Sequence, residues 1–167
     1  GTQIRGIDAI GSNIIAVTPA DIQAAAPLSM SQLLGTIPAL TNTGAVQGQQ
    51  YANYYAPSIH QLGNSASNAT LVLMDGRRLP QGATQHSQTD PGIIPVLALQ
   101  RVEVLTDGAS SIYGSDAVSG VVNFITRSHY DGIQMNAQAG VASGYNTYNA
   151  GLLAGKDWGT GWVMLAG

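Results

Sequence analysis

Cysteine is absent from all 167 residues of the sequence, which excludes disulfides, thiolate nucleophiles and cysteine-based zinc sites. Charge is scarce as well, because Asp, Glu, Lys and Arg make up only 9% of the chain, against about 25% in an average domain. The formal net charge of −3 offers no basic surface for a phosphate backbone, so we expect no nucleic-acid partner. These absences raise the question of how a chain with so few charges stays folded.

Long apolar runs are also missing, since no stretch approaches the ~18 consecutive apolar residues that a membrane-spanning helix needs. The hydrophobic content of 44% is nevertheless too high for a polar disordered chain. The length suffices for one domain with a core, or for one domain plus a short extension. No basic segment followed by an apolar one opens the sequence, and residues 1–6 look like an internal start, so we expect a segment upstream.

The beginning of the chain predicts one short strand and two short helices. Residues 13–17 are a β-prone run, after which Thr18 can cap a helix that stops near Pro27. A second cap at Ser29 begins a helix whose apolar residues recur at helical spacing.

Strand and turn signals dominate the middle of the chain. An apolar run at residues 70–74 ends at Asp75-Gly76, which is a strong hairpin signal. Further strands are expected at residues 101–105 and 121–126, with short helical segments between the strands. This mixture of elements predicts an α+β domain with a mixed sheet.

The pattern changes after Arg127, where apolar and polar residues begin to alternate over residues 133–142. Turns at residues 143–146 and 157–161 separate this strand from two more. Such alternation is typical of transmembrane β-strands, and both tryptophans and two tyrosines lie at or beside the turns, as in an interfacial aromatic girdle. An ordinary antiparallel meander has the same period, so the pattern alone leaves both interpretations open.

Two long segments carry specific motifs. Residues 70–79 read Thr-Leu-Val-Leu-Met-Asp-Gly-Arg-Arg-Leu, and residues 94–127 contain Arg-Val-Glu-Val-Leu, Ser-Ser-Ile-Tyr-Gly-Ser-Asp-Ala and Gly-Val-Val-Asn-Phe-Ile-Thr-Arg. Together with residues 17–22 and 31–40, in the same order, they resemble the plug domain of TonB-dependent outer-membrane receptors. The sequence departs from the family at residues 59–63, Ile-His-Gln-Leu-Gly, where many members carry an Arg-Gly-Leu-Gly-like motif.

The resemblance implies an architecture in two parts. Residues 1–127 are expected to form the plug, a mixed sheet of about four strands with short flanking helices. Residues 128–167 are expected to form the first antiparallel strands of an incomplete transmembrane barrel of the 22-strand class. The family's TonB-contacting segment is expected upstream of residue 1.

The resemblance also implies a function. It predicts a receptor in the outer membrane of a Gram-negative bacterium that binds and imports a scarce nutrient, such as an iron chelate, cobalamin or an oligosaccharide. The expected partners are this nutrient, outer-membrane lipid and the TonB–ExbB–ExbD complex, which supplies energy from the inner membrane. No cofactor is expected, because no bond of the nutrient is made or broken.

Two polar loops, residues 41–57 and 80–92, match plug loops that face the ligand in relatives. Tyrosine suits this role because it offers a flat apolar body with a hydroxyl group. The candidate ligand-binding residues are Tyr51, Tyr54, Tyr55, Gln81, Gln85 and His86.

Charges inside a barrel lumen need partners, because an unpaired buried ion is costly. The resemblance implies that four charged residues of the central block form ion pairs between plug and barrel wall and with each other. They are Arg77, Arg78, Arg101 and Glu103.

Enzyme chemistry finds little support in the sequence. The three histidines lack the spacing of metal ligands, so no metal is expected. Ser110, His86 and Asp107 could supply a hydrolytic triad, but no Gly-x-Ser-x-Gly elbow is present.

The alternative function is that of a structural protein. Three barrel strands cannot close into a barrel, so the chain could polymerise through their exposed edges.

Overall fold

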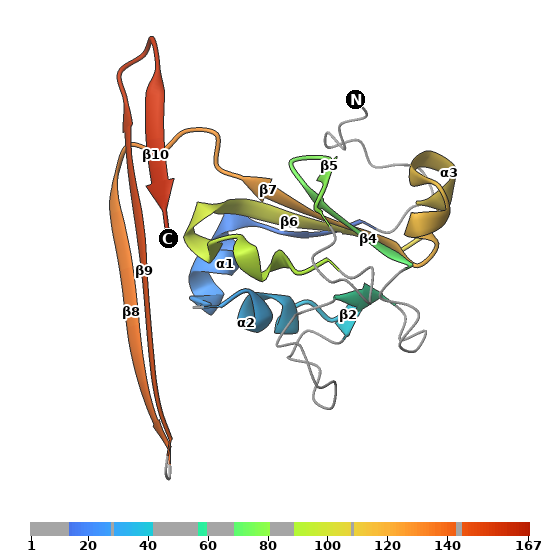
Figure 1. Ribbon diagram of the computed structural model, residues 1–167, viewed down its shortest axis with the longest axis horizontal. Coiled ribbons are helices and arrows are strands. Elements are labelled where there is room, and N and C mark those ends of the chain that lie inside the picture. Colours follow the sequence, from blue (N-terminus) through green and yellow to red (C-terminus); the bar gives the residue numbers. More distant parts are fainter. Residues whose placement is uncertain are drawn as a thin grey trace.

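The computed structural model of the chain contains a mixed five-stranded sheet, an antiparallel three-stranded sheet and one pair of two-residue strands (Figure 1). The antiparallel sheet runs along one side of the molecule, beside the mixed sheet and its helices. The structure describes residues 14–27, 29–41, 57–59, 69–80, 89–107, 109–142 and 145–167.

The mixed sheet has the strand order β1 (Ile14–Val17), β6 (Leu99–Leu105), β7 (Gly120–Thr126), β4 (Thr70–Met74) and β5 (Arg77–Arg78). β4 pairs in parallel with β7, and the other neighbouring strands pair antiparallel. The predicted α+β class and mixed sheet are therefore confirmed. The sheet has five strands rather than about four, because the Asp75-Gly76 turn is followed by the two-residue strand β5.

Two helices cover one face of the mixed sheet: α1 (Pro19–Ala25) and α2 (Met30–Gly35). Thr18 caps α1 as predicted, since its side chain accepts from the backbone N–H of Asp21 while the Asp21 carboxylate accepts from the Thr18 N–H. Ser29 caps α2, because its side chain accepts from the backbone N–H of Gln32. Leu33 of α2 and Phe124 of β7 are fully buried in the core between helices and sheet.

The opposite face of the mixed sheet carries a smaller core under α3 (Ser110–Tyr113) and the 3-10 turn η4 (Ser115–Ala117). Gly120 begins β7 there with φ +136°, and a Cβ at this position would lie 2.3 Å from the carbonyl oxygen of Leu105. Close packing of β6 on β7 thus requires glycine at this position. Four short elements complete this part of the chain: β2 (Leu40–Thr41), β3 (Ser58–Ile59), η2 (Pro91–Ile93) and η3 (Val96–Ala98).

The antiparallel sheet consists of β8 (Gly132–Ala142), β9 (Tyr145–Asp157) and β10 (Trp162–Ala166), in the order β10-β9-β8. The three strands predicted after Arg127 are therefore present. The first turn is shorter than the predicted residues 143–146, because Ala142 already pairs with Tyr145. Among the residues that the structure describes, no helix is long and apolar enough to cross a membrane.

Candidate functional site

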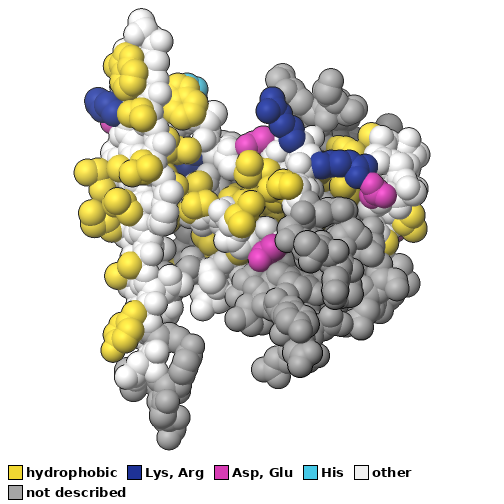
Figure 2. Space-filling view, viewed as in Figure 1, with side chains coloured by type: hydrophobic (Ala, Val, Ile, Leu, Met, Phe, Trp, Pro, Cys, Tyr) yellow, Lys and Arg dark blue, Asp and Glu magenta, His cyan; other side chains and the backbone are white. Residues whose placement is uncertain are grey.

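The two faces of the antiparallel sheet differ in chemistry. One face carries large apolar side chains, and Ile133 and Met135 on it are 71% and 73% exposed. The pairing of β8, β9 and β10 brings further exposed side chains to this apolar face: Tyr148, Leu152, Val163 and Leu165. Figure 2 shows hydrophobic side chains spread along this sheet.

The opposite face of the antiparallel sheet looks toward the mixed sheet. Leu153, which alternates with the exposed Leu152, is fully buried. Leu97 of η3 approaches Gly151, where a Cβ would lie only 3.1 Å from the Leu97 Cδ1 atom. The polar side chains of Gln134, Asn136 and Gln138 therefore lie on the covered side, and the apolar face points away from the rest of the chain.

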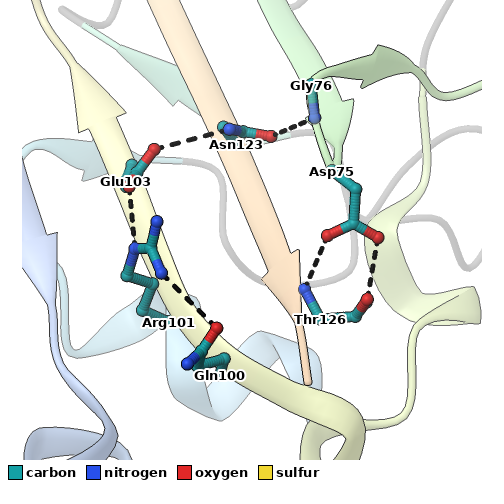
Figure 3. A network of polar contacts seen from close by, with 7 residues as sticks. All are labelled: Asp75, Gly76, Gln100, Arg101, Glu103, Asn123 and Thr126. Carbon is teal, nitrogen blue, oxygen red and sulfur yellow. Dashed lines mark hydrogen bonds and ion pairs between the residues drawn. The ribbon is translucent and has the colours of Figure 1, made fainter. Parts of the chain in front are cut away.

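A network of polar contacts crosses the mixed sheet at Glu103, one of the predicted ion-pairing residues (Figure 3). The Arg101 Nε donates to the Glu103 carboxylate at 2.8 Å, and the Glu103 side chain is only 9% exposed. The Asn123 amide donates to the same carboxylate at 3.4 Å and accepts from the Gly76 N–H at 3.1 Å. Glu103 thus ties β6 to β7 and to the β4–β5 turn.

The pKa of Tyr113 is raised, first by burial of the phenol and second by the negative charge of Glu103. The network therefore acts electrostatically on α3 as well.

Arg78 has its carboxylate partner beside the same mixed sheet, in the 3-10 turn η4. It forms an ion pair with Asp116 of η4, and its guanidinium also donates to the Tyr113 carbonyl at 3.3 Å. The hydrogen bond and positive charge of Arg78 hold the pKa of Asp116 below its usual value. Arg77 is exposed at the other end of the two-residue strand β5, with no carboxylate partner in the described part of the chain.

The segment between β7 and β8 is fastened to β9 and β10 by several contacts. The His129 Nδ1 lies 3.2 Å from the Asp157 carboxylate, and the imidazole meets the Trp162 ring edge-on. Lys156 pairs with Asp131 at 2.9 Å at the end of the apolar face. Charged and aromatic side chains thus border the apolar face where the second predicted turn lies, as in an interfacial girdle.

The six candidate ligand-binding residues lie outside the described residues: Tyr51, Tyr54, Tyr55, Gln81, Gln85 and His86. What the structure describes is the two ends of the first loop, where β2 pairs antiparallel with β3. The Thr41 hydroxyl donates to the Ser58 carbonyl at 3.0 Å and reinforces this pairing. No cluster of three or more metal-ligating side chains occurs within the described ranges.

One contact was not foreseen from the sequence. The Asp75 carboxylate accepts from both the N–H and the hydroxyl of Thr126, at 2.8 and 2.7 Å (Figure 3). The Asp75-Gly76 hairpin signal predicted the turn, but nothing in the local sequence indicates a partner 51 residues away.

The chain matches known proteins in sequence and in structure. The sequence model described as "TonB-dependent Receptor Plug Domain" matches residues 7–121. The iron-regulated outer membrane virulence protein of Vibrio cholerae is 32% identical over 121 residues, covering 70% of this chain and 17% of that protein. This chain therefore spans about a sixth of the length of that relative.

Solved structures agree at the level of fold. The siderophore receptor PiuA from Acinetobacter baumannii is 23% identical with a TM-score of 0.63, over 93% of this chain and 20% of that one. The ferric yersiniabactin uptake receptor FyuA from Yersinia pestis is 17% identical with a TM-score of 0.62, over 93% of this chain and 24% of that one. The predicted outer-membrane location agrees with these relatives, and the chain belongs to the family of TonB-dependent receptor plug domains.

Proposed function

We propose that this chain is the plug and the first wall strands of an outer-membrane receptor that binds and imports an iron–siderophore complex. Its family assignment supports the receptor role, and its relatives, which include an iron-regulated outer membrane protein and siderophore receptors, favour iron chelates over cobalamin or an oligosaccharide. The same relatives lend no support to the alternative of an assembly protein that polymerises through strand edges.

One structural observation carries the proposal: the apolar and polar faces of the antiparallel sheet. Met135 is 73% exposed on the outer face, whereas the inner face carries Gln134, Asn136 and Gln138 beside the buried Leu153. A sheet in water would turn its apolar face toward the core and its polar face outward. The reverse arrangement suits a membrane wall that has lipid on one side and the mixed sheet in its lumen.

We divide the chain after Arg127 into plug and wall. β7 ends at Thr126 and β8 begins at Gly132. Arg127 still donates to the Leu99 carbonyl of the mixed sheet, whereas His129 and Asp131 contact β9 and β10. The wall that β8–β10 begin would be completed by further strands of the receptor.

Ligand would bind on the side of the plug that carries the loops at residues 41–57 and 80–92. The pairing of β2 with β3 supports this assignment for the first loop, because it brings the two ends of that loop side by side. The tyrosines and the polar residues Gln81, Gln85 and His86 would then supply flat apolar surfaces and hydrogen bonds to a chelate.

Energy would come from TonB with ExbB and ExbD, acting on a segment upstream of the plug. Arg101 and Glu103 would help to hold the plug together between transport cycles, and the exposed Arg77 is available to a carboxylate of the barrel wall. Arg78 already has a partner in Asp116 and would act within the plug.

Iron uptake by cells that make the full-length receptor tests the proposal. Radioactive ferric siderophore should accumulate only in cells with both the receptor and TonB, while labelled cobalamin and oligosaccharide should not accumulate. Uptake of cobalamin or an oligosaccharide in place of iron would refute the proposed substrate class. Iron uptake that persists without TonB would refute the proposed coupling.

A further inference from the structure

The two-residue turn between β4 and β5 contains a peptide bond with chemistry of its own. Met74 pairs with Arg77, so Asp75 and Gly76 form the loop, and both have positive φ, +51° and +75°. This is the geometry of a type I′ hairpin turn, which favours glycine at its second position. A Cβ at residue 76 would meet no atom beyond its chain neighbours within 4 Å, so the turn is open to water. Glycine therefore leaves the Gly76 nitrogen unshielded beside the Asp75 carboxyl group.

An aspartate followed by glycine can rearrange without an enzyme. The Gly76 nitrogen attacks the Asp75 Cγ, the amide proton and the carboxyl hydroxyl leave as water, and a five-membered succinimide ring remains. Water then opens this ring. Cleavage of the bond from the nitrogen to Cγ restores aspartate, whereas cleavage of its bond to the main-chain carbonyl carbon gives isoaspartate. Water is the only co-reactant, and it enters in the second step in place of the molecule that was lost in the first.

In the folded chain, β7 holds the two reacting groups apart. The Asp75 carboxylate accepts from the N–H and the hydroxyl of Thr126, at 2.8 and 2.7 Å. The Gly76 N–H donates to the Asn123 Oδ1 at 3.1 Å. Figure 3 shows the carboxylate turned toward Thr126 and the Gly76 nitrogen turned toward Asn123. Attack at Cγ requires both contacts to break, because the nitrogen has to lose its proton and the carboxyl group has to turn toward it.

We propose that the Asp75–Gly76 bond is a latent modification site, at which isoaspartate forms only when the turn separates from β7. The hydrogen bonds to Asn123 and Thr126 make this separation rare, since local opening costs the free energy of the bonds that break.

The product would keep the turn open. In isoaspartate the main chain runs through Cβ and Cγ, so the backbone of the turn gains one atom. The free carboxylate is then carried directly on Cα, one carbon closer to the main chain than the carboxylate that holds Thr126. A brief opening of the turn would thereby become a permanent change in the mixed sheet.

The chain supplies its own reference site. Asp131–Gly132 has the same two residues, but it lies at the start of β8, and its carboxylate pairs with the exposed Lys156. Exposed ion pairs of this kind contribute little free energy and open easily. The rate of succinimide formation at Asp131 should therefore not depend on the contacts that β7 makes with the β4–β5 turn.

Ageing in heavy-oxygen water measures the reaction directly. Each passage through the succinimide introduces one oxygen atom from the solvent at residue 75, whichever product forms, and mass spectrometry of the digested receptor detects it. The full-length receptor in detergent should incorporate far less heavy oxygen at Asp75 than the same receptor held unfolded in urea. Equal incorporation in the folded and unfolded receptor would refute the proposal. This comparison needs no variant, siderophore or TonB, so its outcome is independent of the proposed import of iron.

Variants at Thr126 connect the protection to the contact with β7. Thr126→Val keeps the shape of the side chain but removes the hydroxyl that donates to Asp75, so incorporation at Asp75 should rise about tenfold. Thr126→Ser keeps the hydroxyl and should resemble the natural receptor. Asp131 should incorporate heavy oxygen at the same rate in all three proteins. Unchanged incorporation at Asp75 in Thr126→Val would overturn the proposal, and so would an equal rise at Asp131, which would show general loosening.

Discussion

The carboxylate of Asp75 holds Thr126 by two hydrogen bonds, from its N–H at 2.8 Å and from its hydroxyl at 2.7 Å. The Asp75 N–H in turn donates to the Phe124 carbonyl at 2.9 Å. The turn after β4 is thereby fastened to the end of β7, where the chain leaves the mixed sheet for the antiparallel one. Asp75 has φ +51°, a conformation that Asn tolerates at least as well as Asp.

Removal of either partner should loosen this turn. Asp75→Asn and Thr126→Val should each lower the free energy of unfolding of the mixed sheet by about 1–2 kcal/mol, and the double variant by less than their sum. Urea unfolding of the full-length receptor, followed by a fluorescent reporter on the mixed sheet, measures these values. Ser128→Ala, at an exposed hydroxyl close by, is the control. Strictly additive effects would show that the two side chains are not coupled.

Gly120 and Gly114 provide a matched pair for a second prediction. Both have positive φ, but only at Gly120 would a Cβ meet other atoms, at 2.3 Å from the Leu105 carbonyl oxygen. Gly114→Ala should therefore cost about 1–2 kcal/mol of backbone strain, whereas Gly120→Ala should cost clearly more because β6 must move. The urea midpoints of the two variants give the comparison. Equal midpoints would contradict the close packing of β6 on β7.

The lowered pKa of Asp116 leads to a third prediction. Arg78→Gln should raise this pKa toward the usual 3.8, because it removes the hydrogen bond and the charge that lower it. A group with a lowered folded-state pKa stabilises the protein above its unfolded value, and this contribution is lost as pH falls through the lowered value. Carboxyl carbon NMR of the full-length receptor follows the titration. Arg77→Gln is the control and should leave Asp116 unchanged; an equal shift in both variants would contradict the assigned pair.

The buried Glu103 carboxylate should depend on Arg101. Arg101→Met leaves this carboxylate, which is only 9% exposed, without its cation and should destabilise the mixed sheet by about 1–3 kcal/mol. The double variant with Glu103→Met should recover part of that loss, since no buried charge remains. Urea unfolding measures both, with Arg77→Met as the exposed control. A double variant less stable than Arg101→Met would show that Glu103 does not need Arg101.

Local signals in the sequence predicted local structure. The Thr18 cap, the Asp75-Gly76 turn and the alternation of residues 133–142 all depend on neighbours a few residues apart, and the structure contains each of them. The family motifs added the expectation that these strands form one mixed sheet with short flanking helices. This part of the fold could be predicted because each of these features is determined by residues within one turn or one strand.

The contacts that the sequence did not predict join residues far apart in the chain. The Asp75–Thr126 contact spans 51 residues, and the Arg78–Asp116 pair spans 38. Gly151 leaves room for the Asn136 amide of the neighbouring strand, because a Cβ at residue 151 would lie 2.4 Å from the Asn136 Oδ1. No periodicity or capping rule reaches across such separations, so these features depend on the folded sheet.

The scarcity of charge noted in the sequence now has a structural counterpart. Arg78, Arg101 and Lys156 all have carboxylate partners, and most of the large apolar side chains of β8–β10, unlike Leu153, are exposed on the outer face. Few free charges suit a sheet enclosed by a wall and strands with one face in lipid.

Spin labels on the two faces of β8 test the central claim most directly. The full-length receptor, with any other cysteine replaced, would carry a nitroxide through Met135→Cys or Gln138→Cys and be placed in lipid vesicles. The label at residue 135 should collide with oxygen dissolved in the lipid and be shielded from a water-soluble nickel complex. The label at residue 138 should show the lower oxygen accessibility of a lumen position. If the nickel complex reached the label at residue 135 as readily as it reaches a nitroxide free in water, a membrane wall with the plug on its inner side would be contradicted.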